Sequence, residues 1–255
     1  MLHTADAFAM SDELVIDVRE LRVAYGKFEA VKGVSFGVRR GEIFGIVGES
    51  GSGKSTIAKA IVGLQPIAGG TIAKNGKCQM IFQDAAGSLN PRMTVRQTLN
   101  EVIKVKRTTR FKEAKDLLDL VGLSSAVLEQ YPREMSGGQC QRVSIARALA
   151  CESEALIADE PVSALDVSVQ ARILNLFREL RESLGISILL IAHDLAVVKN
   201  VCDEIGVLEK GVFVDRGEPE QVFSSPCSEY TARLIAAVPR ILQFDNKKEQ
   251  EKRNG

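Results

Sequence analysis

The sequence GESGSGKST, from Gly48 to Thr56, combines residue types and a spacing that suit a polyphosphate. It fits the pattern G-x-x-x-x-G-K-[ST]. Because Gly51 and Gly53 lack a Cβ, the backbone can turn so that successive N–H groups face an anion. Lys54 would add positive charge for the outer phosphates, and the hydroxyl of Ser55 could coordinate Mg²⁺. The residues expected to surround the phosphates are Gly48, Glu49, Ser50, Gly51, Ser52, Gly53, Lys54, Ser55 and Thr56.

The segments on either side of this loop favour the same interpretation. Residues 42–48 (EIFGIVG) are almost continuously apolar, as in a buried strand, and residues 56–64 (TIAKAIVGL) have a helical pattern. A helix N-terminus carries unpaired N–H groups and a partial positive charge, both of which favour an anion. The alternative is a glycine- and serine-rich turn without a ligand, and it does not explain a strand directly before the loop and a helix directly after it.

Polar side chains stand at the ends of three further predicted strands. Asp159 and Glu160 end ALIADE, His193 ends SILLIAH, and Gln83 follows CQMIF. Parallel sheets bind ligands at the carboxyl ends of their strands. There Asp159 could hold Mg²⁺, and Glu160 could polarise a water in line with the terminal phosphate. The amide of Gln83 could bond a metal-bound water, and His193 could contact the same phosphate. Taken singly, a surface acidic pair, a loop glutamine and a structural histidine remain alternatives.

The elements that must position these residues follow the order of an α/β domain with a helical insert. Strands are predicted at residues 14–26 and 31–38, with Tyr25 between them, where its ring could stack on a flat base or be half-buried in a strand. A turn is predicted at Gly69-Gly70. Residues 95–128 are charged and helical, with one apolar stripe at Val95, Leu99, Val102 and Ile103 and another at Ala114, Leu117, Leu118 and Val121.

Strand and helix patterns resume after the insert. CQMIF, ALIADE and SILLIAH are predicted to be buried strands. The remaining predictions are a helix at residues 136–150, a helix at 167–185, a hairpin at 204–217 that turns at Lys210-Gly211, and a final helix at 228–238.

Composition narrows the classes of partner. The 255 residues contain 33 Lys+Arg and 33 Asp+Glu, so no global field favours nucleic acid or an anionic membrane. The five cysteines are odd in number and form no C-x-x-C pair, which is typical of reduced thiols in a cytosolic protein. No apolar run is long enough to span a membrane, and the first residues lack a signal-peptide pattern. We therefore expect a cytoplasmic protein that reaches a membrane only through a partner and does not bind nucleic acid.

Two more motifs complete a recognisable order: SGGQ (Ser136–Gln139) opens a helix, and SALD (Ser163–Asp166) follows the carboxylates. With the phosphate loop, ALIADE and His193, they make the chain resemble the ATP-binding cassette (ABC) family from about Leu14 to Pro239. The resemblance implies an α/β P-loop NTPase (RecA-like) core with an antiparallel β subdomain and an inserted α-helical subdomain. It implies a flexible leader at 1–12, a cassette at 13–240 with the helical subdomain at about 84–135, and a charged, disordered tail at 241–255.

The resemblance also assigns roles to individual residues. Tyr25 is expected to stack on the adenine of ATP, and Ser55, Gln83 and Asp159 to hold Mg²⁺. Glu160, His193 and Gln83 are the expected catalytic residues. The signature residues expected to contact ATP on a partner subunit are Ser136, Gly137, Gly138 and Gln139, and the D-loop residues are Ser163, Ala164, Leu165 and Asp166. The implied partners are a second ATPase subunit in a homo- or heterodimer, transmembrane permease subunits that meet the helical subdomain, and indirectly a solute-binding protein.

Within the family, FQDAAGSLNPRMTV and SSPCSEYTARLIAAVP are most similar to ATPases of oligopeptide and nickel importers. This predicts an energy-coupling ATPase on the inner face of the cell membrane, serving an importer of peptides, nickel or a related solute. Cys227 stands alone, so no iron–sulfur cluster is expected. Met135 replaces the usual Leu, and Cys140 replaces a common Arg or Gln, but neither should prevent activity.

Three alternatives keep part of this interpretation. An ABC ATPase could serve a soluble enzyme complex, as relatives linked to phosphonate breakdown do. An ABC protein acting on DNA or ribosomes usually has a long coiled-coil insert or two fused cassettes, which this chain lacks. If the chain were a small-molecule kinase, the SGGQ motif would have no function.

Overall fold

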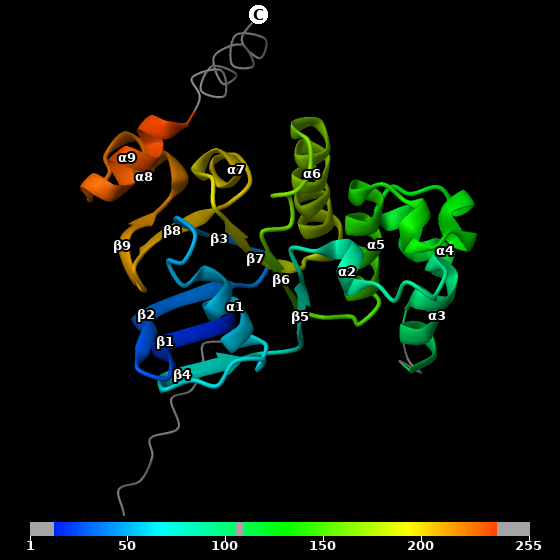
Figure 1. Cartoon of the computed structure of the whole chain (residues 1–255), viewed down its shortest axis with the longest axis horizontal. Coiled ribbons are helices and arrows are strands. Elements are labelled where there is room, and N and C mark those ends of the chain that lie inside the picture. The colour runs from blue at the N-terminus through cyan, green and yellow to red at the C-terminus, as the bar shows by residue number, and fades with distance from the viewer. Residues whose placement is uncertain (1–12, 106–109, 239–255) are drawn as a thin grey trace, which may run out of the picture.

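The computed structural model describes residues 13–105 and 110–238 (Figure 1). The predicted leader (residues 1–12) and tail (241–255) lie outside these residues. The described strands form two sheets, a three-stranded one with the order β2-β1-β4 and a six-stranded one with the order β5-β6-β7-β3-β8-β9. The strands are β1 (Leu14–Tyr25), β2 (Phe28–Arg39), β3 (Ile43–Val47), β4 (Gly69–Lys74), β5 (Cys78–Ile81), β6 (Ala155–Asp159), β7 (Ser187–Ala192), β8 (Glu204–Glu209) and β9 (Val212–Gly217).

The described helices connect these strands and include two short 3₁₀ helices, η1 and η2. They are α1 (Lys54–Ile61), α2 (Ala85–Ser88), α3 (Val95–Val105), α4 (Ala114–Leu120), η1 (Ser125–Glu129), η2 (Pro132–Glu134), α5 (Gly137–Leu149), α6 (Val167–Leu184), α7 (Leu195–Lys199), α8 (Pro219–Ser224) and α9 (Glu229–Ala237).

The six-stranded sheet is buried on both faces. Its β5, β6, β7, β3 and β8 pair in parallel, and β9 adds an antiparallel edge. Side chains of β3 alternate between two cores: Phe44 and Ile46 pack on one face, and Ile43 and Val47 on the other. Burial of both faces explains the continuous apolar runs seen in the sequence. The parallel pairing also brings the carboxyl ends of β3, β5, β6 and β7 to one edge.

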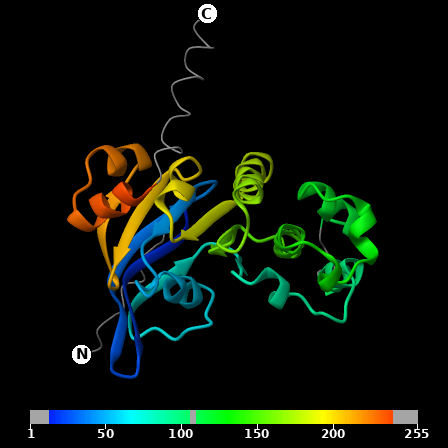
Figure 2. The same ribbon diagram turned by 45° about the horizontal axis from the view of Figure 1, so that its top comes forward.

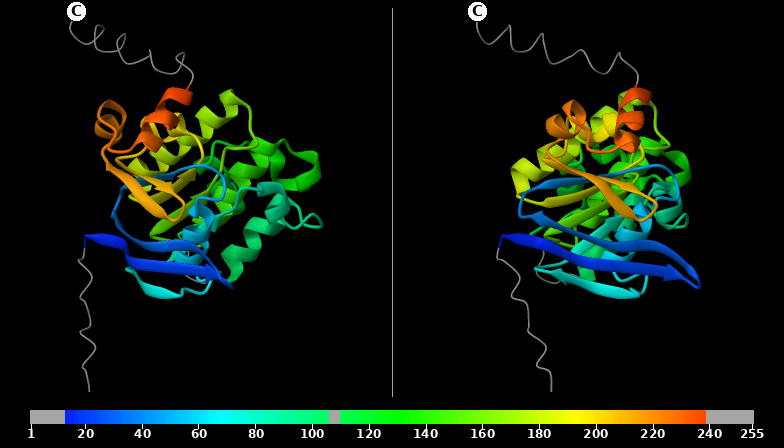
Figure 3. Two further views of the ribbon diagram at one scale, coloured as in Figure 1. Left: turned by 60° about the vertical axis from the view of Figure 1, so that its left-hand side comes forward. Right: turned by 90° about the vertical axis from the view of Figure 1, so that its left-hand side faces the viewer.

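The antiparallel sheet and α1 cover one face of the larger sheet, as the side views in Figure 3 show. Ile57 and Ile61 of α1 are fully buried between β1, β2 and the larger sheet. The phosphate loop, which joins β3 to α1, is therefore held between the two sheets.

Helices α2 to α5 extend to one side of the sheets, away from α8 and α9 (Figures 1 and 2). Both predicted apolar stripes face inward. Val95 and Leu99 of the first stripe are buried and Val102 and Ile103 are partly buried, and the whole second stripe is buried. The amphipathic pattern thus predicted correctly which faces of α3 and α4 pack.

Two local predictions were wrong, and two short helices were missed. Gly69-Gly70 is not a turn but the start of β4, which pairs with β1 through an irregular register. A Cβ on Gly70 would lie 2.2 Å from the carbonyl oxygen of Glu20, so glycine there permits a close strand approach. Strand β5 was expected to be buried, but Cys78 to Met80 are only partly buried because β5 is an edge strand. The short helices α7 and α8 were not predicted.

Candidate nucleotide-binding site

The phosphate loop opens α1 with unpaired donors. Gly53 is the residue before the helix, with φ of 111°, and no side chain caps it. The first backbone N–H groups of α1 are therefore free to bind an anion. The side chain of Lys54 is buried, and its Nζ donates to the carbonyls of Gly48 at 2.7 Å and Glu49 at 2.8 Å. The loop thus curls around the ammonium group that the sequence predicted to serve phosphates.

Gly53, the last glycine of the loop, lies so close to the backbone of Ala30 that a side chain there would clash. A Cβ on Gly53 would lie 2.6 Å from the carbonyl oxygen of Ala30, while one on Gly63 would meet no atom within 4 Å. Both have positive φ, so alanine at either should cost about 1–2 kcal/mol in conformational energy. We expect Gly53→Ala to lose about a further 1–3 kcal/mol from the clash. Urea unfolding of both variants measures the difference, and equal losses would contradict the close approach.

Ser55, in the first turn of α1, meets Asp159, the last residue of β6. Ser55 Oγ donates to Asp159 Oδ1 at 2.8 Å, across the carboxyl ends of β3 and β6. Burial raises the pKa of Asp159, while the hydrogen bond from Ser55 acts in the opposite direction. A hydroxyl beside a carboxylate is a set of hard oxygen donors, which Mg²⁺ prefers. A cation would also offset the cost of burying the carboxylate. The residues present therefore fit a magnesium ion.

Glu160 has an unusual backbone conformation beside the loop. Its φ is 46°, which is uncommon for a residue with a Cβ, and its N–H donates to the carbonyl of Ile191 on β7 at 3.0 Å. Its Oε1 lies 3.9 Å from Lys54 Nζ. Burial lowers the pKa of Lys54, and the carboxylates of Glu160 and Asp159 oppose that shift. The carboxylate of Asp159 therefore lies against the hydroxyl of Ser55, and the carboxylate of Glu160 lies near the ammonium of Lys54.

Lys54, Ser55 and Glu160 line a pocket of about 370 Å³, whose lining does not include Asp159. Tyr25 is 46% exposed, with its hydroxyl 3.4 Å from Thr56 Oγ1, and Phe28 is 64% exposed. Phe28 was not predicted, although an aromatic residue between the two predicted strands, three positions after Tyr25, was a usable signal. The lining residues are Tyr25, Phe28, Ala30, Ser50, Gly51, Gly53, Lys54, Ser55, Thr56, Gln83 and Glu160.

A short chain of hydrogen bonds joins Gln83 to the carboxylate loop. Gln83 Nε2 donates to Ser163 Oγ at 3.1 Å, and Ser163 Oγ donates to the carbonyl of Glu160 at 3.1 Å. The sequence predicted both side chains as functional but not their contact. A shift of Gln83 would therefore be felt at the backbone of Glu160.

The structure places the remaining predicted site residues elsewhere. His193 follows β7 and is exposed, but it does not line the pocket. Ser136 and Gln139 cap α5 reciprocally: Ser136 N–H donates to Gln139 Oε1 at 2.8 Å, and Gln139 N–H to Ser136 Oγ at 3.3 Å. A Cβ on Gly138 would lie 2.6 Å from Val169 Cγ1, so α5 packs closely on α6 there.

The signature loop, SGGQ, and the D-loop do not line this pocket either. Asp166 accepts from Val169 N–H and caps α6, and Ala164 is exposed.

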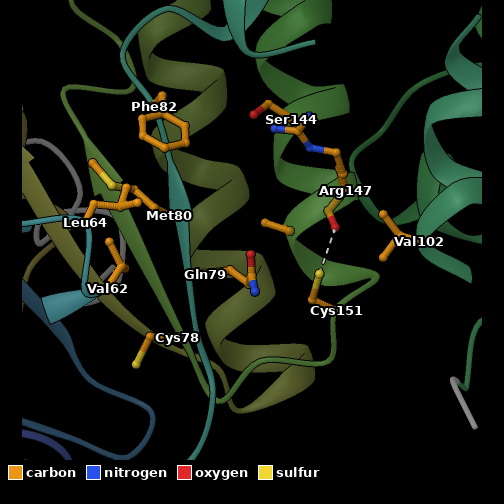
Figure 4. A pocket seen from close by; sticks show the side chains of 11 residues that line it. Val62, Leu64, Cys78, Gln79, Met80, Phe82, Val102, Ser144, Arg147 and Cys151 are labelled. Carbon is orange, nitrogen blue, oxygen red and sulfur yellow. Dashed lines mark hydrogen bonds between the residues drawn. The ribbon is translucent and has the colours of Figure 1, made fainter. Parts of the chain in front are cut away.

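A second pocket of about 370 Å³ lies between β5, α3 and α5 (Figure 4). Met80 and Phe82 contribute apolar surface from the β5 segment, and Leu64, which is 61% exposed, follows α1. Arg147 of α5 donates to the carbonyl of Ser88 at 2.8 Å. The pocket therefore sits where the sheet meets the helices.

Within residues 13–105 and 110–238, no helix has the length and apolar character needed to cross a membrane.

Comparisons with known proteins agree on one family. Residues 31–163 match the family described as ABC transporter. Oligopeptide transport ATP-binding protein OppF of Streptococcus pyogenes serotype M1 is 44% identical, over 90% of this chain and 83% of that protein. AmiF of Streptococcus pneumoniae serotype 4, with the same description, is 43% identical over 90% of this chain and 83% of that protein.

Solved structures share the fold. CbiO1 from Clostridium perfringens, part of an ABC transporter complex, has a TM-score of 0.76 and 26% identity, covering 91% of this chain and 98% of that chain. The ATP-binding cassette MJ0796, in a dimeric post-hydrolysis state with ADP and Pi, has a TM-score of 0.71 and 27% identity, covering 80% and 98%. By its sequence, fold and site, this chain belongs to the ABC transporter family, whose ATPase cassettes hydrolyse ATP with Mg²⁺.

Proposed function

We propose that the chain is the energy-coupling ATPase of a peptide importer. Two observations support this. The phosphate loop meets two carboxylates at the end of β6: Ser55 Oγ lies 2.8 Å from Asp159 Oδ1, and Lys54 Nζ lies 3.9 Å from Glu160 Oε1. The relatives reported above are oligopeptide transport proteins. Nickel is a less supported solute, and the soluble-complex alternative is not favoured by these relatives.

In this proposal each side chain has one task. Lys54 and the first N–H groups of α1 bind the β- and γ-phosphates of ATP, and Ser55 and Asp159, with Gln83, hold Mg²⁺, which offsets phosphate charge. Glu160 would accept a proton from the attacking water as the water oxygen bonds to the γ-phosphorus, while the bond from that phosphorus to the bridging oxygen breaks and ADP leaves. His193 closes the site from the end of β7, and Tyr25 stacks on adenine with Phe28 beside it.

The second half of each site comes from a partner subunit. Ser136 to Gln139 stand at the N-terminus of α5 and Ser163 to Asp166 at that of α6, outside this chain's pocket, which suits contact with ATP on another ATPase subunit. ATP then holds the two subunits together, and hydrolysis separates them. Whether the second subunit is the same chain or a related one does not change this chemistry.

Permease subunits receive the movement that occurs when the two ATPase subunits separate. The pocket between β5, α3 and α5 suits a cytoplasmic segment of a permease, because a segment seated there contacts both the sheet and the helices. Gln83, two residues after β5, lies between this pocket and the nucleotide. The chain itself, a cassette over residues 13–240 with a helical subdomain at about 84–135, would work in the cytoplasm on the inner face of the membrane.

Uptake measurements test this function. In cells lacking the chain but keeping the neighbouring permease genes, we expect the wild-type chain to restore uptake of a labelled tetrapeptide. Leu64→Glu should fail to restore it and should release the chain from sedimented membranes, because a buried, unpaired carboxylate at a docking surface is strongly unfavourable.

Ile67→Glu is the matched control. Ile67 lies three residues further on, is also exposed and does not line the pocket, so this variant should support uptake. Thermal unfolding of both purified variants shows whether they fold alike. If the wild-type chain restored uptake of nickel and not of the peptide, nickel would replace peptides as the proposed solute. A chain that never sediments with the permease would refute the importer role.

A further inference from the structure

The C-terminal helix α9 contacts the phosphate loop through one hydrogen bond. Tyr230 of α9 accepts at its hydroxyl oxygen from the backbone N–H of Glu49, at 2.9 Å. The two residues are 181 positions apart in the sequence. Tyr230 is only 6% exposed, whereas Glu49 is exposed, so the contact is partly buried. The loop is thus supported from outside by an element that none of the sequence motifs includes.

The tyrosine itself is held firmly. Ser228 caps α9 by accepting from the N–H of Thr231, which is fully buried, and the N–H of Cys227 donates to Asp215 of β9 at 2.7 Å. The ring of Tyr230 belongs to the main apolar core, and the guanidinium of Arg233 lies 6.0 Å from its centroid. Burial raises the pKa of Tyr230, so its hydroxyl is neutral at pH 7. The acceptor therefore has a fixed position.

Glu49 is held at both ends of its backbone. Its carbonyl accepts from Lys54 Nζ at 2.8 Å and from the N–H of Ser52 at 3.2 Å, while its own N–H has Tyr230 as partner. Removing the tyrosine hydroxyl would take away the one protein group that holds this N–H in place. The first half of the loop would then be free to turn, and the carbonyl that holds Lys54 would turn with it.

We propose that Tyr230 is a positioning residue for the nucleotide site: it fixes Glu49 and thereby shapes the phosphate loop before ATP arrives. This rests on the phosphate-loop role proposed above and makes α9 part of the site without contact to the nucleotide. The loop needs the same shape in the bound ground state and in the transition state. Loss of this support therefore weakens both equally, which raises KM and leaves kcat unchanged.

Tyr230→Phe tests this role, because it removes the hydroxyl and keeps the ring. With MgATP and the partner ATPase if one is required, we expect KM to rise about three- to ten-fold, the value of one hydrogen bond, at unchanged kcat. Hydrogen exchange at the Glu49 amide should be faster in the variant than in the wild type.

Thr231→Val is the matched control, because it removes a buried hydroxyl from the same helix whose partner is Ser228 and not the loop. It should lower the unfolding temperature without changing KM. A wild-type KM in Tyr230→Phe, a fall in kcat alone, or an equal rise in KM in Thr231→Val would each overturn the positioning role. Should Tyr230→Phe not fold, an unprotected Glu49 amide in the wild type would overturn it. Lys54→Ala in the same assay tests the phosphate loop separately.

Discussion

Replacing Glu160 with glutamine is expected to slow ATP turnover by about a hundred- to ten-thousand-fold while ATP still binds. The amide keeps the size of the side chain and its distance from Lys54, which is 3.9 Å in the wild type. It cannot accept a proton from water as a carboxylate does. The strained backbone at φ 46° is common to both residues, so stability should change little from that source.

The bound state should then persist. Because hydrolysis is what separates the two subunits, Glu160→Gln with ATP and Mg²⁺ should accumulate as a dimer in size-exclusion chromatography, with the partner ATPase added if the chain does not pair with itself. Turnover is measured by phosphate release on the same sample. A mutant that binds ATP and never dimerises, even with the partner, would argue against the role of Ser136 to Gln139.

Glu154→Gln is the matched control for this substitution. Glu154 directly precedes β6, at the opposite end of the strand from Glu160, and its carboxylate accepts from the N–H of Lys77. The glutamine retains a carbonyl oxygen for that bond. We expect turnover close to the wild type. An equally large loss of turnover in Glu154→Gln would show that the effect of Glu160→Gln does not come from the loss of a proton acceptor at Glu160.

Replacing Lys54 with alanine is expected to lower turnover by at least about a hundred-fold, as loss of one preorganised donor at a reacting group does. Lys54 is the one lysine of the loop, and its buried Nζ is held by the carbonyls of Gly48 and Glu49 beside the pocket. Alanine removes both the charge for the outer phosphates and the contacts that close the loop. Isothermal titration with ATP and Mg²⁺ should show a parallel loss of affinity.

Lys59→Ala provides the control for Lys54→Ala. Lys59 lies in the last turn of the same helix and is exposed. The same substitution there should leave binding and turnover near the wild-type values, and circular dichroism should show the same helical content in both variants. Normal turnover by Lys54→Ala would refute the assignment of the phosphate loop.

Prediction from the sequence succeeded for features that are defined within one short segment of the chain. The phosphate loop is defined by residue types at fixed spacing, and the apolar runs around Ile46 and Leu190 are long enough to identify strands buried on both faces. Parallel strands expose their carboxyl ends at one edge, so the meeting of Asp159 with Ser55 followed from the strand predictions. Caps at Ser136 and Asp166 are local as well.

Contacts between distant segments were decided only by the tertiary structure. The bond between Gln83 and Ser163 depends on β5 lying next to β6, which sets the half-burial of β5 as well. Phe28 enters the pocket because the hairpin of β1 and β2 packs against the phosphate loop.

The sequence by itself thus determined the family, most of the longer elements and the residues able to do chemistry, because periodicity and spacing are local properties of the chain. It did not determine which side chains hold the catalytic groups in place. Tyr230 and Glu49 are 181 residues apart, and neither has a pattern that points to the other. Their contact exists only because α9 packs against β9 and α8, which brings Tyr230 to the loop that follows β3. No short stretch of sequence specifies how such distant elements pack.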